Sequence, residues 1–277
     1  MRKKLIGFAV LSTMALMIFG TTGCVKTEPE QTELTVFAAA SLTETLNQIT
    51  ENYKTVNPNV NIVCNFDSSG TLKTQIEEGA ECDLFLSAAA KQMNQLDITA
   101  DPEVNKDGLD FIDPDTRINL LENKVVLAVP EGNPKSINSY EDMATGLKDK
   151  SILMAMGNED VPVGQYTQKI FQFFGLDENS LNADGVLTYG SNVKEVTTQI
   201  KENSVDCGVI YSTDAYSAGL NYVDTATEEM CGRVIYPAAV LKESKHPKEA
   251  KEFLDYLSTE DSCKIFESVG FTCISQN

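Results

Sequence analysis

Short apolar runs alternate along the chain with longer segments in which apolar residues recur every three or four positions. The short runs predict strands, and the recurring positions predict amphipathic helices. The predicted strands cover residues 34–38, 60–66, 83–88, 124–129, 151–156, 186–189, 207–211 and 233–241. The predicted helical faces include Leu42 with Leu46 and Ile49, Leu72 with Ile76, Ile170 with Phe171 and Phe174, and Phe253 with Leu254 and Leu257. This alternation, with runs rich in valine and isoleucine, predicts an α/β fold with mostly parallel sheets.

The first residues of the chain have the pattern of an export signal. Three basic residues precede an apolar stretch from Leu5 to Phe19, which is short for a membrane-spanning helix. The following "GTTGC" resembles the lipobox of bacterial lipoproteins, although Thr21 stands where such boxes usually have leucine. We therefore expect a lipoprotein signal peptide at 1–23, a lipid on Cys24 and a polar tether at 24–32. A simple signal peptide cut nearby is the alternative.

The charge of the chain limits its partners. The formal net charge is −19, and the predicted signal peptide holds three basic and no acidic residues, so its removal makes the chain more negative. A strongly acidic protein is a poor match for nucleic acid or for an anionic membrane surface. We expect neither, apart from contact with a membrane through the lipid anchor.

The cysteines indicate disulfides rather than a metal site. If Cys24 carries a lipid, six others remain, and an exported chain can pair them in many ways. Proximity favours Cys263–Cys273 and Cys207–Cys231. The sequence has no CxxC motif and a single histidine, His246, so we do not expect a site with cysteine or histidine metal ligands. His246 is expected to begin or precede a surface helix.

Small, hydroxyl-rich turns follow five of the predicted strands. They read "AAASLTE", "DSSGTLKTQ", "GNEDVPVGQY", "GSNVKEV" and "YSTDAYS". Ligands of open α/β sheets bind outside the carboxyl ends of strands, where helix N-termini offer unpaired N–H groups to anions. None of these turns has lysine or arginine before its helix begins, so an anion there would be held by neutral donors.

Each turn also has a purely structural interpretation. Ser41-x-x-Glu44 reads as a capping box, and Asn192-x-x-Glu195 resembles one. Ser69 or Thr71 would cap the next helix. In the same reading, the glycine of "SSGTL" only shapes a turn and the tyrosine of "GVIYS" only fills the core. The repetition of similar turns at several strand ends favours a binding site.

Together, "LTVFAAASLTETLNQI", "FDSSGTLKTQIEEGAECDLFLSA", "VPVGQY", "SNVKEV" and "GVIYSTDA" resemble the periplasmic molybdate-binding proteins of ABC transporters. The resemblance covers nearly all of residues 33–274. It implies a two-lobed class II periplasmic-binding-protein fold, with ligand in the cleft between lobes. The length and the two central apolar runs agree with two such lobes, which we place at 33–122 with 233–277 and at 123–232.

The resemblance also implies a ligand set. Molybdate or tungstate would be bound by Ser41 and Ser69, by the backbone amides of Val163 and Val193, and by Tyr211, without direct metal ligands. Ser41 could contribute its hydroxyl, its amide or both. Asp67 departs from the expected pattern, because a carboxylate beside an oxyanion is repulsive unless it accepts a proton.

The resemblance and the export signal together imply a monomeric binding lipoprotein, on the outer face of the cell membrane or in the periplasm, that delivers oxyanion to an ABC permease, without cofactor or enzymatic activity. Binding of another tetrahedral oxyanion, such as sulfate, or of tungstate alone is the nearest alternative. An extracellular hydrolase is less favoured because the chain lacks a G-x-S-x-G elbow. A surface adhesin would show no stabilisation by a small ligand.

Overall fold

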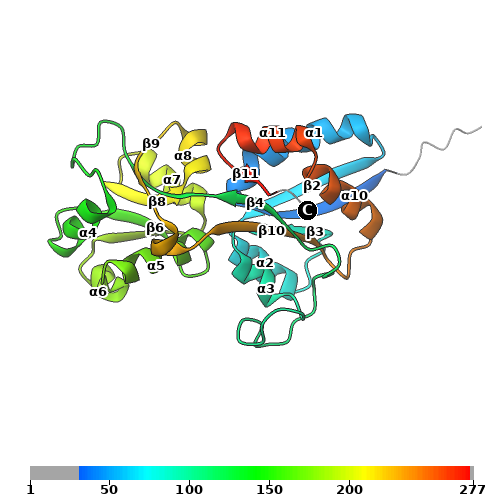
Figure 1. Cartoon of the computed structure of the whole chain (residues 1–277), viewed down its shortest axis with the longest axis horizontal. Coiled ribbons are helices and arrows are strands. Elements are labelled where there is room, and N and C mark those ends of the chain that lie inside the picture. The colour runs from blue at the N-terminus through cyan, green and yellow to red at the C-terminus, as the bar shows by residue number, and fades with distance from the viewer. Residues whose placement is uncertain (1–30, 275–277) are drawn as a thin grey trace, which may run out of the picture. The chain divides into compact units, whose positions relative to one another are not determined.

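The computed structural model describes residues 31–274, so the predicted signal peptide, the lipidation at Cys24 and most of the tether lie outside the described residues. The folded body contains two β-sheets, each flanked by helices (Figure 1). Its two-lobed α/β architecture is the fold class that the sequence predicted.

The first sheet has six strands in the order β11-β4-β10-β3-β1-β2. Their bounds are β1 (Thr32–Ala39), β2 (Val60–Asp67), β3 (Leu84–Leu86), β4 (Ile118–Asn123), β10 (Val234–Val240) and β11 (Thr272–Cys273). Helices α1 and α11 lie on one side of this sheet, and α2 and α3 lie on the other (Figure 1). The helices of this lobe are α1 (Thr43–Val56), α2 (Ser69–Glu77), α3 (Ala90–Gln95), α10 (Pro247–Leu257) and α11 (Glu260–Ser268), with a 3-10 turn η1 (Ala40–Leu42) before α1.

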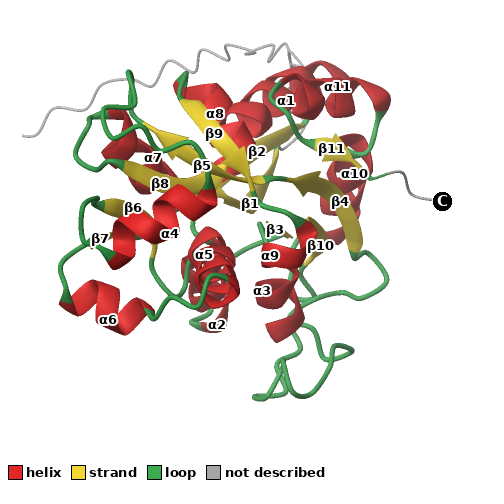
Figure 2. Cartoon of the chain, turned by 60° about the vertical axis from the view of Figure 1, so that its left-hand side comes forward, coloured by secondary structure: helices red, strands yellow, loops and turns green. Residues whose placement is uncertain are grey.

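The second sheet has five strands in the order β7-β6-β8-β5-β9. They are β5 (Val125–Val129), β6 (Met154–Gly157), β7 (Leu187–Gly190), β8 (Cys207–Tyr211) and β9 (Asn221–Thr225). Helices enclose the strands of this lobe as well (Figure 2). They are α4 (Tyr140–Lys148), α5 (Pro162–Phe173), α6 (Glu178–Ala183), α7 (Val193–Lys201), α8 (Ser212–Ala218) and α9 (Glu228–Cys231).

The chain passes between the two sheets at two places. Strand β4 of the first sheet is followed by β5 of the second, with only Lys124 between them. The return runs from β9 through α9 to β10, which pairs with β4 in antiparallel orientation. Figure 1 shows these two crossing segments side by side. The lobe bounds stated above stay a prediction.

All eight predicted strands are present, but the sheets are mixed rather than mostly parallel. Parallel pairs join β1 to β2 and β3, and β6 to β7 and β8. The remaining five pairs are antiparallel, and four of them involve β5 or β10, the strands with which the chain enters each sheet from the other lobe. The unpredicted strands β4, β9 and β11 are held by pairing with neighbours that are distant in sequence.

The two expected disulfides have different outcomes. Cys263 on α11 and Cys273 on β11 form the predicted bond. Cys207 and Cys231 are free and buried, so that pairing is wrong. Cys207 begins the inner strand β8, whereas the thiol of Cys231 points to the backbone carbonyls of Thr227 and Gly232. His246 occupies the N-cap position of α10, as predicted. Among residues 31–274, no helix has the length and apolarity that crossing a membrane requires.

Candidate functional site

The five predicted site residues surround one small cavity. Its lining comprises Ala39, Ala40, Ser41, Asp67, Ser68, Ser69, Ala88, Val161, Pro162, Val163, Val193 and Tyr211. The first sheet's lobe supplies the residues at the ends of β1 and β2, and the second sheet's lobe supplies those at α5, α7 and β8. With about 10 Å³, the cavity has room for about one water molecule.

Ser41 lies in the 3-10 turn η1 and does not cap α1. Helix α1 begins at Thr43, and its N-cap, Leu42, provides no side-chain hydrogen bond. The Ser41 Oγ lies 2.9 Å from the Tyr236 hydroxyl instead. The predicted capping box is therefore wrong, because the intervening turn separates Ser41 from the first helical residues. The neighbouring alanines, Ala39 and Ala40, line the cavity and leave it open.

Ser69 begins α2, but Ser68 caps that helix. The Ser68 Oγ accepts a hydrogen bond from the Thr71 N–H at 3.1 Å, so the prediction of Ser69 or Thr71 as the cap is wrong. The Ser69 Oγ accepts the Ala88 N–H at 2.9 Å. A side chain at Gly70 would place its Cβ 2.1 Å from the Asp160 backbone oxygen. The absence of a side chain at Gly70 thus allows the two lobes to approach closely at this point. The structure does not require this glycine for the shape of a turn.

Two helices of the second lobe direct their N-termini to the cavity. Helix α5 begins with Pro162 and Val163, and α7 begins with Val193. The first amides of a helix have no acceptor within the helix, and the helix dipole makes this end favourable for an anion. Asn192 caps α7 as the sequence predicted, since its side chain accepts the Glu195 N–H at 3.1 Å.

Tyr211, the last residue of β8, places a hydroxyl without a partner at the cavity. It is 1% exposed, and its oxygen has no hydrogen bond within the described part of the chain. An unpaired buried hydroxyl costs about 1–3 kcal/mol. Burial raises the pKa of Tyr211 well above its ordinary value of 10, as does the nearby Tyr236, so the hydroxyl keeps its proton. The Tyr211 ring packs edge-on against Tyr166 and Tyr236, at centroid distances of 6.4 and 5.8 Å.

The charged side chains near the cavity pair with protein groups. The carboxylate of Asp67 accepts the Ser68 N–H at 2.7 Å. The Lys194 Nζ lies 2.7 Å from a Glu44 carboxylate oxygen and 3.2 Å from the buried Asp214. The residues that line the cavity include no lysine or arginine. The site therefore offers neutral donors, and within 31–274 no cluster of three or more acidic, cysteine or histidine side chains could hold a metal ion.

Sequence reasoning missed several residues around these groups. Asn123 and Tyr236 contact each other and lie beside Ser41, and Lys194 lies between Glu44 and Asp214. "ENKVV" and "VIYPA" look like ordinary strand sequences, and "NVKEV" looks like an ordinary helix start. No local signal distinguishes these residues, because their partners lie far away in the sequence.

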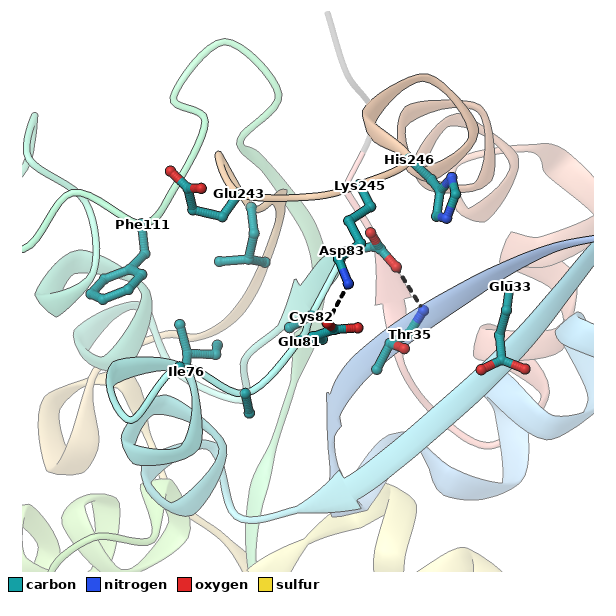
Figure 3. Close-up of a pocket in the computed structure, with 13 residues that line it drawn as sticks. Glu33, Thr35, Ile76, Glu81, Cys82, Asp83, Phe111, Glu243, Lys245 and His246 are labelled. Atoms are coloured by element: carbon teal, nitrogen blue, oxygen red, sulfur yellow. Dashed lines mark hydrogen bonds and ion pairs between the residues drawn. The ribbon is translucent and has the colours of Figure 1, made fainter.

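A larger cavity of about 450 Å³ lies at the opposite end of the first sheet (Figure 3). Its lining includes Glu33, Glu81, Asp83 and Glu243. The Asp83 carboxylate accepts hydrogen bonds from the Thr35 N–H at 2.8 Å and the Ser244 hydroxyl at 2.6 Å. Four carboxylates against Lys245 and His246 make this cavity unfavourable for an oxyanion. Size alone therefore does not identify the anion site.

The fold and the cavity define a two-lobed solute-binding protein of the periplasmic-binding type. The chain belongs to the bacterial extracellular solute-binding proteins, whose family model matches residues 34–272. It is 33% identical over 274 residues to a putative ABC transporter substrate-binding lipoprotein, YvgL, of Bacillus subtilis, covering 98% of each chain. It is 32% identical over 246 residues to the molybdate-binding protein ModA of Escherichia coli, covering 88% of this chain and 90% of ModA.

A solved structure is also similar. The substrate-binding domain of a putative molybdenum ABC transporter from Clostridium difficile is 31% identical, with a TM-score of 0.62. The match covers 88% of this chain and all of that domain (100%). These findings confirm the resemblance to molybdate-binding proteins that the sequence motifs indicated.

Proposed function

We propose that this protein captures molybdate, and also tungstate, for an ABC importer. The observation that carries the proposal is the convergence of five neutral groups on one cavity: Ser41, Ser69, Val163, Val193 and Tyr211. The unpaired Tyr211 hydroxyl supports a ligand that accepts hydrogen bonds. Hydrogen bonds to a charged partner contribute about 1.5–3 kcal/mol each, so several together offset much of the loss of hydration of a dianion.

The two lobes give this site a way to open and close. Oxyanion entry widens the cavity, and a ligand bound to donors from both lobes favours the closed form. The permease then recognises that closed form. In this proposal the protein acts as a monomer anchored by lipid at Cys24 outside the membrane, needs no cofactor and catalyses no reaction. The lipoprotein description of the Bacillus subtilis relative and the export signal of this sequence support the anchor.

A titration panel tests the proposal. Purified protein is titrated with molybdate, tungstate, sulfate and phosphate while heat release and thermal unfolding are recorded. Molybdate and tungstate are expected to bind with micromolar or lower Kd, and molybdate at 100 times its Kd stabilises the fold by about 2.7 kcal/mol. Tight binding of sulfate alone would assign the protein to another oxyanion, and no binding by any of the four would refute the proposal.

A further inference from the structure

The large cavity at the opposite end of the first sheet from the oxyanion cavity has two unlike halves. Its volume of about 450 Å³ lies within the range of sites for small organic ligands. Figure 3 shows Phe111 and Ile76 on one side of it and Glu33 and His246 on the other, with Asp83 between them. A ligand that fills this cavity therefore combines an apolar body with a polar group.

Asp83 is a buried carboxylate without a counter-ion. It is 7% exposed, and among residues 31–274 no lysine, arginine or histidine side chain pairs with it. Its oxygens accept the Thr35 N–H at 2.8 Å and the Ser244 hydroxyl at 2.6 Å, which fixes the carboxylate at the wall of the cavity. A carboxylate has about four acceptor positions, so further positions remain for a ligand. Because buried charges in proteins are usually paired, Asp83 indicates a cationic ligand.

The other charged side chains of the cavity leave Asp83 open to such a ligand. Lys245, the lysine among the lining residues, forms its ion pair with Glu81 and not with Asp83. The side chains of Glu33 and Glu243 are exposed and have no hydrogen bond or ion pair with another described residue. The cavity therefore has an excess of negative charge around the buried carboxylate, and this charge is complementary to a cation.

We propose that this cavity binds a small organic cation, namely a primary amine with an apolar body. The ammonium group donates hydrogen bonds to the Asp83 carboxylate, and the apolar body packs against Ile76 and Phe111. Within the described residues, 31–274, no cluster of acidic, cysteine or histidine side chains could hold a metal ion in place of the amine. The inference goes beyond the proposed function, because this cavity shares no lining residue with the oxyanion cavity.

Three probes test the two halves of the site separately. The probe 2-phenylethylamine has both the cation and the apolar body, whereas 2-phenylethanol has only the apolar body and ethylamine has only the cation. In NMR titrations of the purified protein at neutral pH, 2-phenylethylamine is expected to bind with a Kd of about 1 mM or lower, and the other two probes at least about tenfold more weakly. No binding of 2-phenylethylamine, or equal binding of it and either partial probe, would overturn the proposal.

Two substitutions locate the bound amine. Asp83→Asn keeps the size of the side chain and removes its charge, so the affinity for 2-phenylethylamine should fall by about tenfold or more. Glu33→Gln removes a more exposed charge at the same end of the cavity, and a fall of about two- to fivefold is expected. Because Asp83 also bonds to Thr35 and Ser244, thermal unfolding of each variant is recorded, and Glu33→Gln gives the result if Asp83→Asn does not fold.

Glu131→Gln is the matched control, because it removes one negative charge at an exposed position after β5, outside the cavity. It measures the general attraction of an amine to a chain with a net charge of −19, and it should bind 2-phenylethylamine like the unaltered protein. An equal loss of affinity in Glu131→Gln and in the folded cavity variants would overturn the inference, as would unchanged affinity in every folded cavity variant. Molybdate does not enter this test, so its outcome is independent of the proposed function.

Discussion

The Lys194 Nζ on α7 lies 2.7 Å from the nearer carboxylate oxygen of Glu44 on α1 and therefore joins the two lobes by an ion pair. The contact lies one residue after Val193 and three residues after Ser41, both of which line the proposed site. Lys194 also contacts the buried Asp214 at 3.2 Å. The ion pair thus connects the two lobes beside the cavity.

Removal of this ion pair should speed ligand release. We expect Glu44→Gln to raise the dissociation rate of molybdate by up to about fivefold, since a partly exposed pair contributes about 0.2–1 kcal/mol. Stopped-flow measurements at low and high salt check this, and the effect should shrink with salt. Asp184→Asn is the control, because it breaks the exposed Lys150–Asp184 pair away from the cavity. Equal rates in the two variants would contradict a role for Glu44 in closure.

The buried Asp214 should make stability depend on pH. Burial raises its pKa from 3.8 to about 6, against the opposing effect of Lys194. Between pH values equal to these two pKa values, the Asp214 carboxyl is protonated in the folded state and ionised in the unfolded state. The stabilisation that this proton gives the folded state is therefore complete below about pH 4 and is lost as the pH rises through about 6. The difference between the two pKa values corresponds to a contribution of up to about 3 kcal/mol to the free energy of unfolding.

Asp214→Asn removes this titration without changing the shape of the side chain. Relative to the unaltered protein, the variant should gain stability as the pH is raised from about 4 to 7. Thermal unfolding across that range is the measurement. Parallel stability curves for the two proteins would show that Asp214 does not titrate in this window.

The Tyr211 hydroxyl should matter for the ligand and not for the fold. Because it has no partner in the described structure, Tyr211→Phe removes an unsatisfied buried group, and the free protein should be as stable as before or more so. Molybdate affinity should fall by about tenfold or more. Calorimetric titration and unfolding of the same sample give both values. Unchanged affinity would remove Tyr211 from the site.

Gly70 should be required for closure of the lobes. In Gly70→Ala the new Cβ would lie 2.1 Å from the Asp160 backbone oxygen across the lobes, so we expect at least about tenfold weaker molybdate binding with little loss of stability. Thr74→Ala, at an exposed position of the same helix, is the control. A Gly70→Ala variant that binds like the unaltered protein would show that closure does not need this approach.

The sequence by itself predicted eight of the described strands, the strand-end turns and the five site residues through local pattern and family resemblance. An apolar run such as 207–211 has few alternatives to a buried strand. The alanines before Ser41 have small side chains, and they leave space in the cavity whichever residues lie opposite them. Asn192 and Glu195 are three residues apart, so their cap could also be predicted. These features depend on neighbours along the chain.

Only the tertiary structure decided strand direction, the strands β4, β9 and β11, and the contacts of the site residues. The Ser41 hydroxyl had a local partner available but bonds to Tyr236, which lies 195 residues further along the chain. Lys194 reaches Glu44 across 150 residues. A hydrogen bond or ion pair depends on distance and direction in space, and these are set by the tertiary packing of elements that are far apart in the sequence.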